Sequence, residues 1–142
     1  MAQKKAFIKQ VQGLTFTGKT DSNHWITMDG PEEFGGSNAA IRPKELLLLS
    51  LGGCTGADVA SILQKKRVKL EGFEMNLTAD ATEDYPQVFT KIHIEYVFYG
   101  NDIAEKDVEK AIELSQTKYC GVTAMLSKAM EITTSFRIEK SK

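Results

Sequence analysis

The sequence has two cysteines, Cys54 and Cys120, and these are its residues best suited to chemistry. A pair of reduced thiols can be oxidised and then reduced again, so the predicted chemistry is thiol redox. The 65 residues from 55 to 119 separate them, which is not a CxxC motif and carries no pairing information. Neither His24 nor His93 has metal-like spacing to a cysteine, so no metal site is expected.

Each cysteine also has an interpretation without chemistry. Cys54 lies in a glycine-rich stretch of an expected helix, where a cysteine can be a buried and inert small apolar residue. Cys120 precedes a short helical pattern, where the helix dipole would lower its pKa and favour the thiolate. It can equally be a poor N-cap residue with no reactivity. From their local surroundings, both alternatives stay open.

Two carboxylates lie near Cys54 in the sequence. Glu45 precedes it by nine residues, which on an ideal helix is a rotation of about 900° and a rise of roughly 13.5 Å. Glu45 therefore reaches a cysteine site only from another subunit or across a bend, and its simpler role is to complement the helix N-terminus. Asp58 lies on the same helix face as Cys54. A carboxylate there would oppose thiolate formation, so its contribution is doubtful.

The elements that must position these residues follow from hydrophobic patterning. A long helix is predicted over 44–67, because Pro43 suits the first helical position and these residues contain no further proline. The apolar block over 46–49 predicts that this helix is buried on most sides. Three helix-weakening glycines, Gly52, Gly53 and Gly56, predict a close backbone approach around Cys54.

Strands are predicted on both sides of this helix. Before it, strands are expected over 7–16 and 24–28, with a turn over 18–23 between them. After it, strict alternation predicts strands over 73–82, 88–99 and 132–139. Two helical patterns, which include residues 108–115 and 122–130, separate the last two strands. Segregated strands and helices in this order predict an α+β fold with antiparallel sheet.

Length and charge limit the classes of function. A chain of 142 residues fits one domain spanning 1–142. With 18 basic and 19 acidic residues, the net charge of −1 argues against nucleic-acid binding. The sequence has no run of about 18 apolar residues, so no membrane span is expected. The polar N-terminus lacks the apolar stretch of a signal peptide, so a cytoplasmic location is expected, where the thiols stay reduced.

Several segments together resemble one protein family. The segment 42–55 (RPKELLLLSLGGCT) resembles the signature of the OsmC/Ohr family, the osmotically inducible and organic hydroperoxide resistance proteins. The segment 114–122 (LSQTKYCGV) resembles that family's second cysteine site. Residues 13–16, 58–65 and 118–120 look closest to the YhfA-like branch. The resemblance spans nearly the whole chain.

The resemblance implies an α+β fold and an intertwined homodimer, with antiparallel sheets around two long buried central helices. The N-terminal strands, within 1–41, would pair with the partner subunit. The sites would lie at the subunit interface, which agrees with the geometry that keeps Glu45 from Cys54 within one straight helix.

The resemblance also implies a function. The chain would be a thiol-dependent peroxidase in which Cys54 attacks an organic hydroperoxide and becomes a sulfenic acid. Cys120 would then form a disulfide with it, and an external dithiol would reduce that disulfide. Glu45 would orient an arginine that stabilises the thiolate. No resident cofactor and no metal are expected.

The sequence departs from the family at this arginine. The peroxidases take it from the N-terminal strands, whereas this chain has no arginine before Arg42. Arg42 and Lys19 are the supporting candidates, with Lys9 also available, although a lysine lacks the planar fork of arginine. One alternative is therefore a non-catalytic dimer that binds a small apolar molecule or senses oxidation. Another is a dimer whose cysteines only pack.

Overall fold

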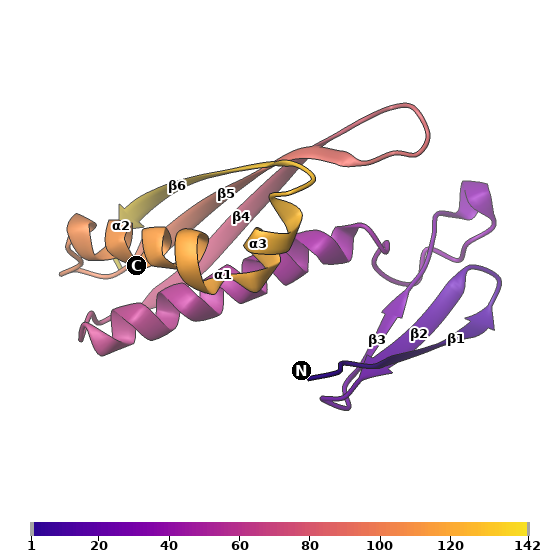
Figure 1. The fold of residues 1–142 in the computed structure, drawn as a ribbon, viewed down its shortest axis with the longest axis horizontal. Helices are drawn as coiled ribbons and strands as arrows, with labels where there is room; N and C mark the ends of the chain where they lie inside the picture. The colour runs from indigo at the N-terminus through magenta and orange to yellow at the C-terminus, as the bar shows by residue number, and fades with distance from the viewer. Residues whose placement is uncertain (1, 142) are drawn as a thin grey trace. The chain divides into compact units, whose positions relative to one another are not determined.

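The computed structural model describes residues 2–141, which divide into two compact units. The N-terminal unit extends to Leu47, and the C-terminal unit begins at Leu48 (Figure 1). The single domain predicted over 1–142 stays a prediction.

The N-terminal unit is an antiparallel sheet in the order β1-β2-β3, formed by β1 (Ala6–Gln12), β2 (Thr15–Thr20) and β3 (Trp25–Met28). A 3-10 turn, η1 (Glu32–Phe34), follows. The single strand predicted over 7–16 is wrong, because the chain reverses at Gly13, whose φ of 54° suits glycine. The turn predicted from Gly18 starts later, since Gly18 pairs with Ile26 of β3.

Helix α1 (Glu45–Lys65) follows the N-terminal sheet and matches the predicted helix within two residues at each end. Its start is capped because the Arg42 backbone N–H donates to Oε1 of Glu45 at 2.9 Å. By length and composition, α1 is apolar enough to cross a membrane, a property that the core helix of a soluble protein shares.

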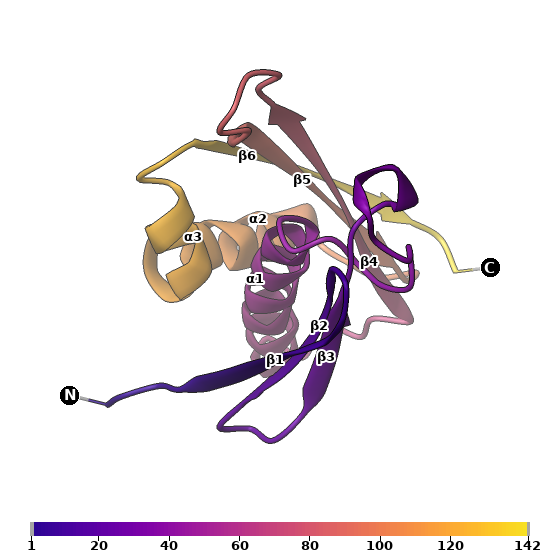
Figure 2. The same cartoon turned by 90° about the vertical axis from the view of Figure 1, so that its right-hand side faces the viewer.

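The C-terminal unit has a sheet in the order β4-β5-β6, formed by β4 (Gly72–Ala81), β5 (Phe89–Tyr99) and β6 (Glu131–Glu139). Helix α2 (Glu105–Leu114), a π-helical turn η2 (Ser115–Tyr119) and helix α3 (Gly121–Leu126) connect β5 to β6. Figures 1 and 2 show α1, α2 and α3 on one face of this sheet.

The predicted α+β class is confirmed, but the expectation of a purely antiparallel sheet is wrong. Strands β4 and β5 pair antiparallel, whereas β5 and β6 pair parallel. The helical connection returns the chain to the end of the sheet at which β5 begins, so β6 must run in the same direction as β5.

The core of the C-terminal unit lies between α1, α2 and β5. Its buried apolar side chains are Leu51, Val59 and Leu63 of α1, Ile92, Ile94, Tyr96 and Phe98 of β5, and Val108, Ala111 and Ile112 of α2. The alternate residues of β5 all face the helices, as the period of two predicts.

The predicted close approach to α1 is confirmed at two of its three glycines. A Cβ at Gly56 would lie 2.5 Å from Cε of Met75, and one at Gly52 would lie 3.1 Å from Leu77 Cδ1, whereas Gly53 has open space. The buried residues of α1 lie on one face. Leu49 is 60% exposed, so burial on most sides is not reached within a single chain.

Candidate active site

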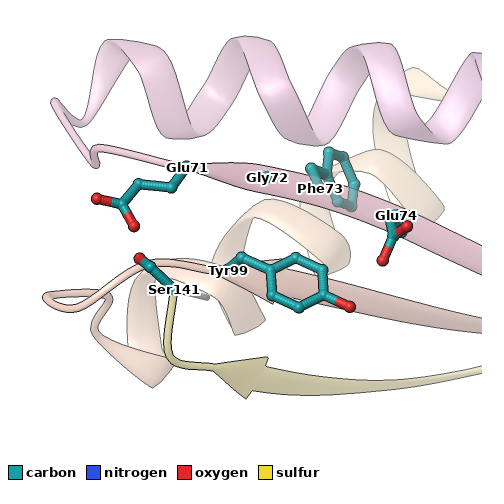
Figure 3. Close-up of a pocket in the computed structure, with 6 residues that line it drawn as sticks. All are labelled: Glu71, Gly72, Phe73, Glu74, Tyr99 and Ser141. Atoms are coloured by element: carbon teal, nitrogen blue, oxygen red, sulfur yellow. The ribbon is translucent and has the colours of Figure 1, made fainter.

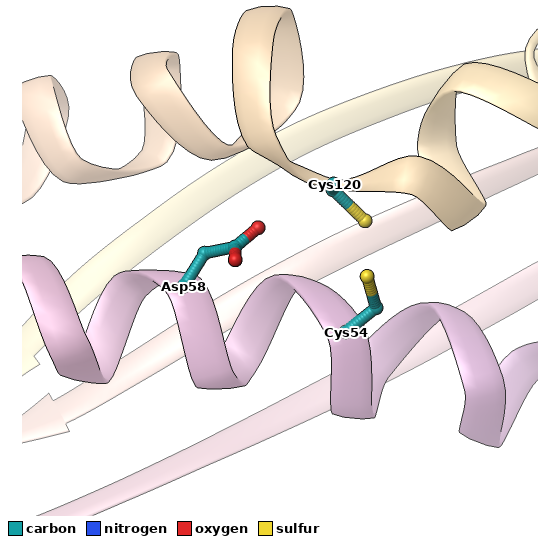
Figure 4. Close-up of side chains that lie close together, drawn as sticks. All are labelled: Cys54, Asp58 and Cys120. Atoms are coloured by element: carbon teal, nitrogen blue, oxygen red, sulfur yellow. The ribbon is translucent and has the colours of Figure 1, made fainter. Parts of the chain in front are cut away.

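The C-terminal unit brings Cys54 and Cys120 together (Figure 4). Cys54 lies on α1, and Cys120 lies between η2 and α3. The two Sγ atoms and a carboxylate oxygen of Asp58 all lie within 4.8 Å of one another. Both thiols are free. The cysteines that the sequence singled out therefore share one site, although their separate roles stay predictions.

The environment of Cys120 differs from the one expected. Its side chain is 4% exposed, and the backbone N–H of Thr123 donates to its Sγ at 3.3 Å. Burial raises the pKa of Cys120, the hydrogen bonds from Thr123 lower it less, and the neighbouring Cys54 raises it further. The lowered pKa predicted from the helix dipole is wrong, because burial outweighs the effect of a helix only six residues long. Cys54 is partly exposed.

A chain of buried hydroxyl groups ends on the carboxylate of Asp58. The Ser115 hydroxyl donates to Oδ2 of Asp58 at 2.9 Å. This uses the only proton of Ser115, so the Thr55 hydroxyl must donate to Ser115 at 2.7 Å. By the same reasoning, the Tyr96 hydroxyl donates to Thr55 at 2.7 Å. Burial raises the pKa of Tyr96 to about 12, which keeps this first donor protonated.

The amide of Gln116 links this chain to the second cysteine. Its Nε2 donates to the hydroxyl oxygens of Thr55 at 3.1 Å and Tyr96 at 3.3 Å. Its Oε1 accepts from the Thr123 hydroxyl at 3.3 Å, and Thr123 also contacts Cys120. Both Gln116 and Ser115 come from η2, a π-helical turn of the kind that often occurs at functional sites.

Sequence reasoning did not place these polar residues in the site. Only Asp58 has a signal in the sequence, its position four residues after Cys54 on the same helix face. Ser115 belongs to a helical pattern and Tyr96 to a strand pattern, and neither pattern indicates a site. No sequence spacing could have joined them, because they come from three separate elements that meet only in the fold.

The other predicted site residues belong to the N-terminal unit. Glu45 caps α1, as its simpler interpretation predicted. The Arg42 guanidinium donates to the backbone oxygen of Ala40 at 3.0 Å and to Oδ1 of Asn38 at 2.8 Å. The expected roles of Glu45 and Arg42 at the cysteines stay predictions.

Both candidate lysines lie beside Trp25. The Nζ atoms of Lys19 and Lys9 lie 5.4 Å and 5.8 Å from the centroid of its ring, which is the geometry of a cation–π contact. Lys19 also donates to Oδ1 of Asn23 at 3.4 Å. That either lysine replaces the family's arginine at the cysteines stays a prediction.

A pocket of about 390 Å³ borders Asp58 and so lies next to the cysteine pair. It is lined by Asp58, Ser61, Ile62, Lys65, Lys66, Leu114 and Tyr119. A larger pocket of about 510 Å³ lies elsewhere, between the start of β4 and Tyr99 (Figure 3). Neither pocket is lined by a cysteine, but the smaller one includes Asp58, whose carboxylate lies within 4.8 Å of both sulfur atoms, and the larger one includes no residue of this cluster.

Comparisons with known proteins cover both cysteines. A family model described as OsmC-like protein matches residues 35–135. Protein YhfA of Escherichia coli (strain K12) is 40% identical over 134 residues, which are 94% of this chain and 97% of that protein.

Solved structures share the fold. The crystal structure of a hypothetical protein from Aquifex aeolicus VF5 has a TM-score of 0.87 and 32% identity, and the match covers 100% of both chains. An organic hydroperoxide resistance protein OsmC from Legionella pneumophila has a TM-score of 0.69 at 14% identity, covering 96% of this chain and 98% of that one.

Proposed function

Because the chain belongs to the OsmC-like protein family, we propose that it is a thiol-dependent peroxidase that reduces organic hydroperoxides. One observation carries this proposal: the reduced Sγ atoms of Cys54 and Cys120 lie within 4.8 Å of each other. Small rotations of the two side chains bring sulfur atoms at that separation to a disulfide bond of about 2.05 Å.

Cys54 is the attacking residue, because it is partly exposed whereas Cys120 is buried. Its thiolate sulfur attacks the terminal peroxide oxygen, and the O–O bond breaks. The departing alkoxide takes a proton and leaves as an alcohol, while Cys54 becomes a sulfenic acid. The apolar side chains of Ile62 and Leu114 suit the organic part of such a substrate.

Cys120 is the resolving residue. Its sulfur attacks the sulfenic sulfur of Cys54, the S–S bond forms, and the S–O bond breaks. The thiol proton leaves with the hydroxyl group as water. Two electrons from an external dithiol then reduce the disulfide by thiol–disulfide exchange. The Thr123 N–H holds the Cys120 sulfur in place.

The proposed enzyme works as a homodimer in the cytoplasm, where its thiols stay reduced between turnovers. Support for the homodimer comes from apolar side chains that a single chain leaves exposed. Those on the N-terminal sheet are Phe7, Ile8, Val11, Phe16, Trp25 and Ile26, and those on α1 are Leu47 and Leu49. Exposed apolar side chains in such numbers are typical of protein interfaces.

A second candidate is a non-catalytic member of the family that senses oxidation or binds a small apolar molecule. The absence of an arginine before Arg42 favours it, because the peroxidases of the family are expected to use an arginine of the N-terminal strands beside the attacking sulfur. Such a protein would form the Cys54–Cys120 disulfide with little or no turnover.

The test is turnover of cumene hydroperoxide by purified protein with dithiothreitol. Wild-type protein should consume the peroxide, and Cys54→Ser should lose at least about 10³-fold of that rate because it lacks the nucleophile. Cys120→Ser is the matched variant. With the dithiothreitol left out, it should react once and leave a sulfenic acid on Cys54 that dimedone traps.

Two results separate the candidates. No turnover with Cys54 still unoxidised would exclude the peroxidase. An intrachain Cys54–Cys120 disulfide, found by mass spectrometry without multiple turnovers, would favour the oxidation sensor.

A further inference from the structure

We propose that Cys54, Cys120 and Asp58 bind one Zn²⁺ ion through their two sulfur atoms and one carboxylate oxygen, with a fourth position open. All three residues belong to the C-terminal unit. Figure 4 shows the two sulfur atoms facing each other between α1 and the segment before α3, with the Asp58 carboxylate beside them. This binding goes beyond peroxide reduction and does not depend on it.

The distances suit the ion. Tetrahedral zinc has Zn–S bonds of about 2.3 Å and Zn–O bonds of about 2.0–2.2 Å, which place neighbouring ligand atoms about 3.5–3.8 Å apart. The three ligand atoms already lie within 4.8 Å of one another. Side-chain adjustments of about 1 Å therefore bring them to coordination distance.

The carboxylate is held as a metal ligand would be. The hydroxyl chain from Tyr96 through Thr55 and Ser115 ends on Oδ2 of Asp58. This chain restricts the rotation of the carboxylate and leaves its second oxygen available. Carboxylate ligands of metals typically accept a hydrogen bond of this kind, which fixes their orientation.

Charge would help to hold a cation once the thiols lose their protons. Within residues 2–141, no lysine, arginine or histidine side chain forms an ion pair with Asp58. Metal binding releases both thiol protons to solvent, and the resulting two thiolates and one carboxylate carry three negative charges. Two thiolates favour Zn²⁺ over Mg²⁺ or Ca²⁺, which prefer oxygen ligands.

Zinc and hydroperoxide would compete for the same sulfur. A sulfur atom bound to the ion has its electron pair engaged, so the loaded protein should resist oxidation until a chelator or a stronger binding partner removes the metal. The sequence contains no recognisable zinc motif, because the third ligand is a carboxylate and 65 residues separate the two cysteines.

The experiment uses Co²⁺ as a spectroscopic probe of the reduced, chelator-treated full-length chain. We expect a thiolate-to-cobalt charge-transfer band together with the visible bands of tetrahedral cobalt, saturating at one equivalent per chain. One equivalent of Zn²⁺ should then bleach both. Protein oxidised to the disulfide should show neither.

Variants identify the ligands. Cys54→Ser and Cys120→Ser should each weaken the charge-transfer band, and Asp58→Asn should weaken zinc binding at least about 10-fold while keeping both thiols, because loss of a ligand costs no less than loss of a group that orients one. Asp107→Asn is the matched control, because Asp107 lies on α2 in an ion pair with Lys66. Far-UV circular dichroism checks that each variant is folded.

Absence of the charge-transfer band in wild-type protein, or an unchanged affinity in Asp58→Asn, would overturn the site. Peroxide turnover is measured separately in the metal-free protein. Failure of the peroxidase therefore leaves the zinc result standing, and the reverse also holds.

Discussion

The N-terminal unit buries a carboxylate where the C-terminal unit buries a core of apolar side chains. Asp29 is 2% exposed. It accepts hydrogen bonds from the Thr15 hydroxyl at 2.9 Å and from the backbone N–H groups of Gly30 at 2.7 Å, Ala39 at 3.1 Å and Ser37 at 3.2 Å. Polar contacts of this kind organise the loop after β3, whereas helices and sheet in the C-terminal unit pack mainly through apolar side chains, with the buried hydroxyl chain from Tyr96 to Asp58 among them.

The two units also differ in where their apolar side chains lie, and this difference indicates which surface can bind a partner. Among the described residues, every buried apolar side chain lies at or beyond Leu51. The N-terminal sheet instead exposes apolar groups on both faces, with Phe7 and Trp25 on one and Ile8 and Ile26 on the other. A unit whose apolar side chains are exposed is suited to pack against the surface of a partner subunit, as the proposed homodimer requires.

The largest effect should come from truncating the apolar core. Phe98→Ala removes a fully buried ring that stacks on Phe73 with centroids 4.7 Å apart. It should lower the free energy of unfolding by about 3–5 kcal/mol, as large-to-small core substitutions do. Urea unfolding followed by circular dichroism measures this loss. Phe34→Ala, in the N-terminal unit where the ring is exposed, should cost less than about 1 kcal/mol. An equal loss of unfolding free energy in the two variants would contradict this difference between the units.

A charge on the N-terminal sheet should act on association rather than on the fold. Ile26→Glu places a carboxylate among the exposed apolar residues of the face shared with Ile8, which would be desolvated in the proposed homodimer. The dimer dissociation constant should rise by at least about 10-fold. Sedimentation velocity over a concentration series measures it.

Tyr85→Glu is the control for this association, because Tyr85 is exposed on the loop between β4 and β5. It should leave the dissociation constant unchanged. A wild-type chain that is monomeric at all concentrations would end the homodimer proposal.

The smallest effect should be the acid sensitivity of the N-terminal unit. Burial raises the pKa of Asp29, but the hydrogen bonds from Gly30, Ala39, Thr15 and Ser37 outweigh it and lower the pKa below its usual 3.8. A lowered folded-state pKa means that ionised Asp29 stabilises the unit fully above about pH 4, and that this stability is lost as the pH falls through the folded value.

Trp25, the single tryptophan, makes this acid transition visible by fluorescence. Asp29→Asn should flatten the pH dependence of the stability of the N-terminal unit below about pH 4. It should also lower that stability at neutral pH, because a neutral amide replaces a carboxylate that accepts hydrogen bonds from four donors. Asp84→Asn, at an exposed loop position, should leave the fluorescence transition where it is in the wild type.

The C-terminal unit was more predictable than the N-terminal one. Strict alternation in β5 and β6 and the apolar run of α1 are strong local signals, and the structure has these elements close to where they were expected. The N-terminal prediction joined β1 to part of β2, because Gly13 lies inside a run of β-forming residues and gives a weak turn signal. Parallel pairing of β6 has no local signal, since either direction presents the same alternation.

The sequence by itself determined the α+β class, the central helix, its glycine contacts at Gly52 and Gly56, and the choice of Cys54 and Cys120. These depend on local periodicity, on residue size and on motifs, which are properties of neighbouring residues. Only the tertiary structure decided that the sulfur atoms meet, that burial raises rather than lowers the pKa of Cys120, and that Asp58 completes the cluster. The reason is physical: distance, desolvation and the direction of a hydrogen-bond chain arise between elements, and no pattern within one element contains them.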